Sequence, residues 1–204
     1  LKSCKKIFCY TDKIKNFPHN FKSKMIIISP LVRKNIYELK SYTKTDEKFN
    51  ILVVGGSQGA RVFDDIIKDS IIKISSTKSI KIFQQTSDKN IQYLRDFYSK
   101  NNVENIIFSF NKNFSNIIKL ADLCITRAGA STLAELSVLN IPFIAVPLPT
   151  SKDNHQMENA NFYKNNDCCW VIEQKFFKEK IDEHLKVIFE KKSDYLKKKD
   201  NLKK

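Results

Sequence analysis

From Phe49 onward, short β-branched apolar runs alternate with longer stretches in which apolar residues recur at helical spacing. Residues 50–54 form the clearest run, and Gly55 and Gly56 bound it, as expected for a strand buried in a parallel sheet. The other predicted strands are 80–83, 106–108, 123–126, 143–146 and 169–172. The predicted helices are 62–74, 91–98, 114–120, 132–139 and 155–164, followed by two Lys-rich helices. This alternation predicts an α/β fold with a doubly wound parallel sheet and helices on both of its faces.

The first 48 residues lack this regular pattern. Residues 7–10 are apolar, residues 25–28 are predicted to form a buried strand that Ser29 and Pro30 close, and residues 34–48 are interpreted as a linker. This segment is too short to form a domain of its own. We therefore assign residues 49–204 to one domain with Lys-rich C-terminal helices, and residues 1–48 to a preceding segment and a linker.

The composition indicates a globular, strongly basic protein. The apolar fraction of 42% suits a buried core, and no apolar run approaches the roughly 18 residues of a membrane span. The N-terminus has no signal-peptide pattern, and five cysteines without paired spacing predict reduced thiols. The net charge of +14 favours an anionic partner, although a solvated basic face explains it more simply. Because RNA-binding and zinc-finger signatures are absent from the sequence, no nucleic-acid partner is predicted.

Four loops follow predicted strands, and the carboxyl ends of the strands form the ligand-binding edge of a doubly wound sheet. These loops are 55–60, 110–114, 127–132 and 147–159. The first contains Gly-Gly-Ser-Gln-Gly between a strand and a helix, which is the context of a phosphate-binding loop, or else only a tight connection. It matches neither the dinucleotide pattern nor the P-loop pattern. Since Gln84 and Gln85 stand where a dinucleotide fold has an acidic residue, a nicotinamide enzyme is disfavoured.

Residues 126–136 give the strongest indication of a ligand-binding site in the sequence. A buried strand is predicted to end in a tight turn at Gly129, and a helix to start at Ser131 or Thr132, where free N–H groups suit a phosphate. Arg127 adds donors for phosphate oxygens, and Glu135 lies one turn into the helix, where it could accept hydrogen bonds from sugar hydroxyls. The alternative is a capping box in which Glu135 reaches back to Thr132.

A second polar group lies at the start of the predicted helix 155–164. Gln156 and Asn159 share a face of this helix and could bind the hydroxyls of a sugar. The alternative is that Asp153 caps the helix, with Gln156 at the third helical position. His155 has no paired partner in the sequence, and we do not assign it as a catalytic base.

Together these segments resemble the C-terminal domain of the MurG family, the undecaprenyldiphospho-muramoylpentapeptide β-N-acetylglucosaminyltransferases. The resemblance rests on Gly-Gly-Ser-Gln-Gly-Ala at 55–60, Arg-Ala-Gly-Ala-Ser-Thr-Leu-Ala-Glu-Leu at 127–136, Ile-Pro at 141–142 and Asp-Asn-His-Gln-x-x-Asn-Ala at 153–160. Ser-Pro-Leu-Val-Arg at 29–33 resembles the interdomain Pro-Val-Arg segment of the family, with one residue inserted. The match covers the chain from residue 25 to its end.

The resemblance implies the Rossmann-like donor-binding half of a GT-B fold, which binds UDP-N-acetylglucosamine without a cofactor or a metal. By their matching positions, the residues implied in contacts with the diphosphate and neighbouring donor groups are Ser57, Gln58, Arg127, Ala130, Ser131 and Thr132. Glu135 matches the acid that holds both ribose hydroxyls, and Phe110 and Asn111 lie at the uracil pocket. Gln156 and Asn159 match the residues that bind the sugar hydroxyls, and Arg33 matches an interdomain arginine near the donor.

In the complete enzyme, the resemblance implies transfer of N-acetylglucosamine to undecaprenyl-diphospho-muramoyl-pentapeptide in peptidoglycan synthesis. The enzyme is expected on the cytoplasmic face of the inner membrane, in peripheral contact with anionic lipid. The acceptor site and the general base belong to an N-terminal domain that residues 1–24 cannot supply, so this chain alone is expected to be inactive. Three alternatives remain, namely the donor subunit of a split transferase with a separate acceptor subunit, a nucleotide-sugar-binding remnant, and a basic protein whose tail contacts lipid or nucleic acid.

Overall fold

The computed structural model describes residues 1–10, 12, 14, 16–28, 31–39, 47–56, 61–111 and 113–203. The chain divides into two compact units, Leu1–Val32 and Arg33–Lys204. The division therefore comes before Arg33, whereas the sequence analysis places it after residue 48.

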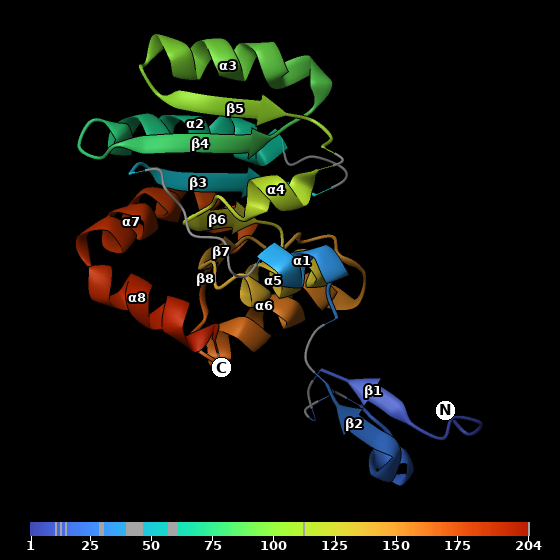
Figure 1. The fold of residues 1–204 in the computed structure, drawn as a ribbon. Helices are drawn as coiled ribbons and strands as arrows, with labels where there is room; N and C mark the ends of the chain where they lie inside the picture. Colours follow the sequence, from blue (N-terminus) through green and yellow to red (C-terminus); the bar gives the residue numbers. More distant parts are fainter. Residues whose placement is uncertain are drawn as a thin grey trace. The chain divides into compact units, whose positions relative to one another are not determined.

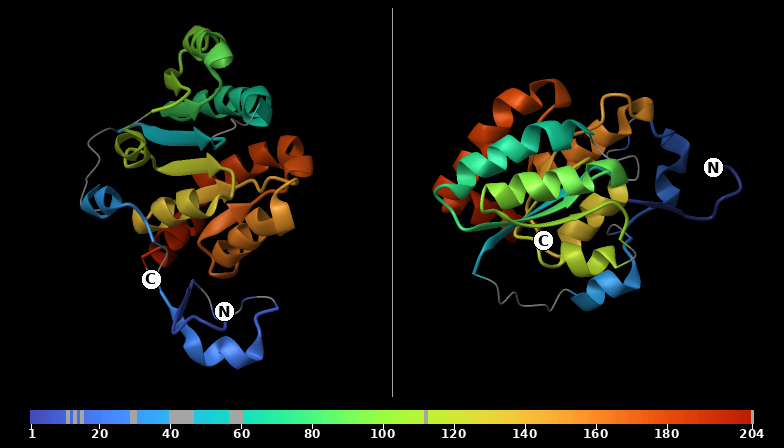
Figure 2. Two further views of the ribbon diagram at one scale, coloured as in Figure 1. Left: turned by 90° about the vertical axis from the view of Figure 1, so that its right-hand side faces the viewer. Right: turned by 90° about the horizontal axis from the view of Figure 1, so that it is seen from above.

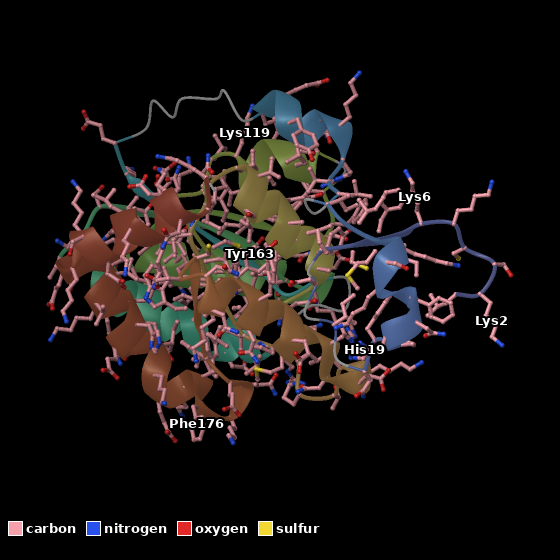
Figure 3. The ribbon with its side chains drawn as sticks, turned by 90° about the horizontal axis from the view of Figure 1, so that it is seen from below. Lys2, Lys6, His19, Lys119, Tyr163 and Phe176 are labelled. Carbon is pink, nitrogen blue, oxygen red and sulfur yellow. The ribbon has the colours of Figure 1, made fainter. Side chains whose placement is uncertain are left out.

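The smaller unit contains a two-stranded parallel sheet. Strand β1 (Ile7–Cys9) pairs with β2 (Met25–Ile27), and the 3₁₀ helix η1 (His19–Lys24) leads directly into β2. Among the described residues of this unit only Cys9 is buried, and Ile27 is 51% exposed. The predicted strand at 25–28 is therefore present but not buried, because two short strands are too small to enclose an apolar face. Lys2 and Lys6 point away from the ribbon into solvent (Figure 3).

The larger unit is built on a parallel sheet of six strands (Figure 1). They are β3 (Phe49–Val54), β4 (Ile80–Gln85), β5 (Glu104–Phe108), β6 (Leu123–Thr126), β7 (Phe143–Ala145) and β8 (Cys169–Val171). Their order is β5-β4-β3-β6-β7-β8, so the chain runs outward from β3 in one direction and from β6 in the other. All six agree with the predicted strands to within two residues at each end.

Helices cover both faces of this sheet, and Figure 2 shows α2 and α7 on one side of β3 and α4 and α5 on the other. The α-helices are α1 (Lys34–Glu38), α2 (Arg61–Ser75), α3 (Ile91–Lys100), α4 (Phe114–Ile118), α5 (Ala130–Val138), α6 (His155–Asn165), α7 (Phe177–Glu190) and α8 (Lys192–Asn201). The 3₁₀ helices of this unit are η3 (Asp88–Asn90), η4 (Lys152–Asn154) and η5 (Gln174–Phe176). The predicted doubly wound α/β fold is confirmed.

Helix α1 corrects the sequence-based interpretation of residues 34–38 as part of a linker, and residues 40–46 of that predicted linker lie outside the described residues. Ile36 is fully buried, and α1 packs against α5. The sequence showed no helical periodicity here because a helix of five residues buries a single apolar side chain. Tertiary contacts, rather than helix propensity, stabilise so short a helix.

The main core lies between the sheet and α2, α3 and α7. Ile67 of α2, Ile181 of α7 and Ile51 of β3 are all fully buried in it. On the opposite face, the ring of Phe143 in β7 packs edge-on against Tyr163 of α6, with the ring centroids 5.3 Å apart. Within the described part of the chain, no helix is both long and apolar enough to cross a bilayer.

Candidate functional site

The carboxyl ends of β3 and β6 meet at the centre of the sheet, where the strand order reverses. Thr126 lies beside Val54 in the ladder, and the Arg127 N–H donates to the Val54 carbonyl over 3.3 Å. The loops after the two strands therefore start side by side, at the edge where open α/β sheets bind ligands. Ser57 and Gln58, the predicted diphosphate contacts in the first loop, lie outside the residues that the structure describes, and their roles stay predictions.

The second loop leads into α5, which begins at Ala130, one residue earlier than predicted. Gly129 is the N-cap in an extended conformation, with φ −69° and ψ 131°, so the predicted tight turn at this glycine is wrong. Among the described residues no side chain caps α5, which excludes the capping box between Thr132 and Glu135. A Cβ added at Gly129 would meet no other atom of the described residues within 4 Å, and Ala130 and Ser131 are exposed. An anion can therefore reach the N–H groups of the first turn, which a helix leaves without internal partners.

Glu135 lies one turn further along α5 and is paired with Arg33. Its side chain is 9% exposed, whereas that of Arg33 is 52% exposed. Arg33 Nε donates to Glu135 Oε1 over 2.9 Å, and Arg33 Nη2 donates to Glu135 Oε2 over 3.1 Å. Two predicted donor-binding residues, separated by 102 positions in the sequence, thus contact each other directly.

The guanidinium of Arg127 is directed into the protein. Arg127 Nη1 donates to the Val146 carbonyl over 3.1 Å, and Nη2 donates to Gln174 Oε1 over 2.6 Å. The group also lies 5.0 Å from the centre of the Phe63 ring, and burial lowers the pKa of Arg127. Arg127 therefore ties the end of β6 to the end of β7 and to η5. Its predicted contact with a diphosphate stays a prediction.

Gln156 and Asn159, the predicted sugar contacts, hold the backbone of Ala128. Gln156 Oε1 accepts hydrogen bonds from the Ala128 N–H over 3.2 Å and from the Leu148 N–H over 3.0 Å. Asn159 Nδ2 donates to the Ala128 carbonyl over 3.0 Å. The loops after β6 and β7 are thereby fixed to the start of α6. Because two N–H groups occupy the Gln156 oxygen, its NH₂ group is the part that remains for a sugar hydroxyl.

The start of α6 is strained rather than capped. Asn154, not Asp153, is the N-cap residue, and no side chain caps the helix, so the alternative role of Asp153 is wrong. Asp153 and Asn154 have φ values of 50° and 56°, which non-glycine residues rarely adopt. Two such residues in succession indicate a backbone that the surrounding contacts hold in place.

Phe110 and Asn111, the predicted uracil-pocket residues, follow β5 at the carboxyl edge of the sheet. The Phe110 side chain is 78% exposed, so its ring is accessible to a planar ligand. Asn111 Oδ1 accepts from the Asn113 N–H over 2.7 Å, which shapes the turn before α4. Their contact with a uracil stays a prediction.

A buried carboxylate, Asp64, fixes the start of α2. It accepts hydrogen bonds from Gln84 Nε2 at 2.9 Å, Thr86 Oγ1 at 2.5 Å and Asn90 Nδ2 at 2.9 Å. The Tyr98 hydroxyl donates in turn to Gln84 Oε1 over 2.8 Å, and burial raises the pKa of this tyrosine. The sequence analysis missed this group. Its one sequence signal is an acidic residue beside the apolar positions of a predicted helix.

Two further hydrogen-bonded pairs have no local signal in the sequence. Gln174 accepts from Arg127, and Asn35 donates to Ser115 Oγ over 2.8 Å, but the members of each pair lie far apart along the chain. In the described part of the chain, no three His, Cys, Asp or Glu side chains gather so that they could hold a metal ion. The expectation of a site without metal or cofactor stays a prediction.

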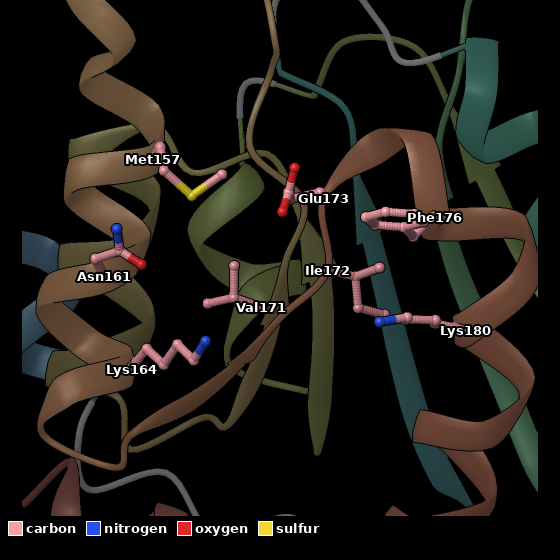
Figure 4. A pocket seen from close by; sticks show the side chains of 8 residues that line it. All are labelled: Met157, Asn161, Lys164, Val171, Ile172, Glu173, Phe176 and Lys180. Atoms are coloured by element: carbon pink, nitrogen blue, oxygen red, sulfur yellow. The ribbon is translucent and has the colours of Figure 1, made fainter.

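A separate pocket lies alongside β8, between α6 and α7 (Figure 4). It encloses about 270 Å³ and is lined by Met157, Asn161, Lys164, Val171, Ile172, Glu173, Phe176 and Lys180. Two lysines and one glutamate give it mixed charge, and none of the predicted donor-binding residues lines it. We therefore place the candidate site at the strand ends.

The sequence profile described as Glycosyltransferase family 28 C-terminal domain matches residues 50–204. A Pelagibacter ubique protein named UDP-N-acetylglucosamine–N-acetylmuramyl-(pentapeptide) pyrophosphoryl-undecaprenol N-acetylglucosamine transferase is 46% identical over 204 residues, covering 100% of this chain and 57% of that protein. A Rickettsia canadensis protein of the same name is 39% identical over 175 residues, covering 83% of this chain and 49% of that protein.

Among solved structures, the crystal structure of Acinetobacter baumannii MurG aligns with a TM-score of 0.71 and 23% identity. The alignment covers 91% of this chain and 53% of that one. At this identity the likeness concerns the fold. The chain spans about half the length of the curated relatives that it matches.

Proposed function

The chain belongs to glycosyltransferase family 28 through its C-terminal domain, and from this premise we propose that it is the donor-binding half of an N-acetylglucosamine transferase. The donor, UDP-N-acetylglucosamine, is the one in the names of its relatives. One observation carries the proposal: a buried carboxylate, Glu135, lies one turn into α5 beside the strand ends where doubly wound folds bind nucleotides. From there it can accept hydrogen bonds from ribose hydroxyls while the first turn of α5 binds the diphosphate.

The proposed reaction is the one for which the relatives are named, with a lipid-linked muramyl-pentapeptide as acceptor in peptidoglycan synthesis. A hydroxyl oxygen of the acceptor attacks the anomeric carbon of the donor sugar. The bond from that carbon to the diphosphate breaks with inversion, and UDP leaves with the bonding electrons. The N-terminus of α5 and the positive charge of Arg127 stabilise the departing diphosphate.

The proton of the acceptor hydroxyl needs a base, which we assign, together with the acceptor site, to a further domain or a partner chain. The greater length of the relatives supports this assignment. Turnover is then expected only when that part is present. We place the assembled enzyme on the cytoplasmic face of the inner membrane, where a net charge of +14 favours contact with anionic lipid.

The test is calorimetric titration of the full 204-residue chain with UDP-N-acetylglucosamine, UDP-glucose and NAD. We expect UDP-N-acetylglucosamine to bind most tightly, UDP-glucose to bind more weakly through the shared UDP, and NAD to give no binding heat. Replacement of Glu135 by Ala should weaken UDP binding by about 1–3 kcal/mol, because it leaves polar groups of the ligand unpaired. Equal binding of NAD and UDP-N-acetylglucosamine, or binding of neither, would contradict the proposal.

A further inference from the structure

The ion pair between Arg33 and Glu135 closes one side of the carboxylate. Arg33 Nε donates to Glu135 Oε1 over 2.9 Å and Arg33 Nη2 donates to Oε2 over 3.1 Å, so one guanidinium spans both oxygens. An ionised carboxylate has about four lone-pair sites, two on each oxygen, and Arg33 occupies the two that face the same direction. The other two point away from each other. The arginine therefore fills the side of Glu135 on which two donors could bind next to each other.

A vicinal diol needs that same side of the carboxylate. The two hydroxyls lie on adjacent carbon atoms, so both O–H groups can donate to one carboxylate only where the two acceptor sites also lie side by side. Arg33 and a ribose are therefore alternative partners of Glu135 rather than simultaneous ones. In the observed arrangement a side chain of the protein itself occupies the proposed ribose acceptor.

The two members of the pair differ in how easily they can leave it. The Glu135 side chain is 9% exposed, whereas the Arg33 side chain is 52% exposed. A guanidinium that swings into solvent becomes hydrated, but the buried carboxylate needs another donor in place of the arginine. The diol of a ligand supplies two such donors. Exchange of the partners therefore requires Arg33 to move and leaves Glu135 in place.

The backbone of Arg33 is anchored, so this exchange involves only the side chain. Arg33 is the N-cap residue of α1, whose Ile36 is fully buried and whose Asn35 side chain donates to Ser115 Oγ over 2.8 Å. Helix α1 also packs against α5, the helix that carries Glu135. The contact can therefore open and close again by rotation of one side chain, while α1 stays in place.

We propose that Arg33 is an autoinhibitory side chain, which closes the ribose-binding side of Glu135 in the free chain and swings away when a uridine nucleotide binds. This inference rests on the proposed function, because it takes Glu135 as the acceptor for the ribose hydroxyls. It gives Arg33 an effect on affinity opposite in sign to that of a donor contact. Loss of a residue that contacts the ligand weakens binding, whereas loss of a residue that blocks the site strengthens it.

The size of the effect follows from the fraction of molecules in which the contact is open. A ligand that binds only the open state has its affinity reduced in proportion to that fraction. An ion pair with one largely exposed partner favours the paired state by up to about fivefold. Removal of the arginine should therefore raise the affinity for a ribonucleoside by up to about this factor.

The test measures the affinity of the ¹⁵N-labelled full chain for uridine and for 2′,3′-dideoxyuridine from backbone amide shift changes. Both nucleosides lack phosphates, so a contact between Arg33 and a diphosphate cannot affect the result. Arg33→Ala should bind uridine about fivefold more tightly than the native chain and dideoxyuridine equally tightly, because only uridine displaces the arginine. Arg33→Lys keeps the charge without the two-point contact and should tighten uridine binding by a smaller factor. The control Lys34→Ala removes the neighbouring exposed charge and should change neither affinity.

A salt titration of the native chain tests the same contact without a substitution. Uridine is neutral, so screening acts on the ion pair and not on the ligand. Between about 0.05 M and about 0.5 M sodium chloride, the affinity of the native chain for uridine should rise by about twofold. The affinity of Arg33→Ala should stay constant over the same range.

Three results would overturn the autoinhibitory role and leave the proposed function in place. They are weaker or unchanged uridine binding by Arg33→Ala that thermal unfolding shows to be folded, equal tightening of uridine and dideoxyuridine, and a uridine affinity of the native chain that does not rise with salt. Failure of the native chain to bind UDP would overturn the proposed function and this inference with it.

Discussion

Gly56 and Gly129 both lie beside the strand ends, but they have different backbone conformations. Gly56 has φ +83°, a conformation that disfavours any residue with a Cβ. Gly129 has φ −69°, which every residue can adopt, and a Cβ there would meet no other atom within 4 Å in the part of the chain that the structure describes. The missing side chain at Gly129 therefore leaves room at the start of α5 rather than relieving the backbone.

Replacement of each glycine by alanine should separate binding from folding. Gly129→Ala should change the free energy of unfolding by less than about 1 kcal/mol, because the gain from restricting the unfolded chain opposes the loss from a poorer N-cap residue. Its UDP-N-acetylglucosamine affinity should fall by about tenfold, or roughly 1.4 kcal/mol, because the methyl group narrows access to the first turn of α5. Gly56→Ala should instead cost about 1–2 kcal/mol of stability. Urea unfolding and calorimetry measure both effects, and a Gly129→Ala variant with lower stability and unchanged affinity would contradict this account.

Gln156 is expected to matter for folding as well as for the sugar. Gln156→Ala leaves the N–H groups of Ala128 and Leu148 without their acceptor and should cost about 1–3 kcal/mol of stability. A matched control is Gln92→Ala on α3, whose amide lies at the surface and donates to Asp96 over 3.0 Å. If urea unfolding gives the same free energy of unfolding for both variants, Gln156 does not stabilise the fold through these two hydrogen bonds.

Asp64 links α2 to neighbouring elements. It accepts a hydrogen bond from Gln84 of β4, and Gln84 in turn accepts one from Tyr98 of α3. Asp64→Ala leaves three donors without an acceptor and should lower the free energy of unfolding by about 3 kcal/mol. Asp65 is the neighbouring carboxylate on the same helix but is exposed, so Asp65→Ala should change stability by no more than about 0.5 kcal/mol. Similar stabilities of the two variants in chemical denaturation would refute the role given to Asp64.

The strands and long helices could be predicted because their signals are local. The run before Gly55 and the run at 123–126 carry β-branched residues over a strand's length, and both strands appear within a residue of where they were expected. Their adjacency in the sheet explains why the two predicted phosphate-binding loops start side by side. Helix α1 escaped prediction because only Ile36 is buried in it, which leaves no periodicity to detect.

The contacts within the candidate site could not be predicted in the same way. The pairing of Arg33 with Glu135 and that of Arg127 with Gln174 join residues separated by 102 and 47 positions. Residue types and spacing indicated that Arg127 and Glu135 belong near a nucleotide, and the family resemblance added Arg33, but neither showed which side chains contact one another. Such pairings depend on how α1, α5 and η5 pack, and no local pattern encodes that packing.

For the larger unit as a whole, strand order decides where a ligand can bind. Because the order reverses between β3 and β6, the carboxyl ends of these two strands mark the point where doubly wound folds bind ligands. The accessible start of α5 and the carboxylate of Glu135 lie at this point. The pocket beside β8 is a competing location, because its two lysines can also attract a nucleotide.

The most direct measurement is a titration of the ¹⁵N-labelled chain with UDP-N-acetylglucosamine, followed by backbone amide chemical shifts. The account predicts the largest shift changes at Gly56, Ala130, Ser131 and Glu135, around the meeting point of β3 and β6. The largest changes at Lys164, Val171 and Lys180 would place the nucleotide in the pocket beside β8 and contradict the account. An absence of shift changes at donor saturation would contradict it as well.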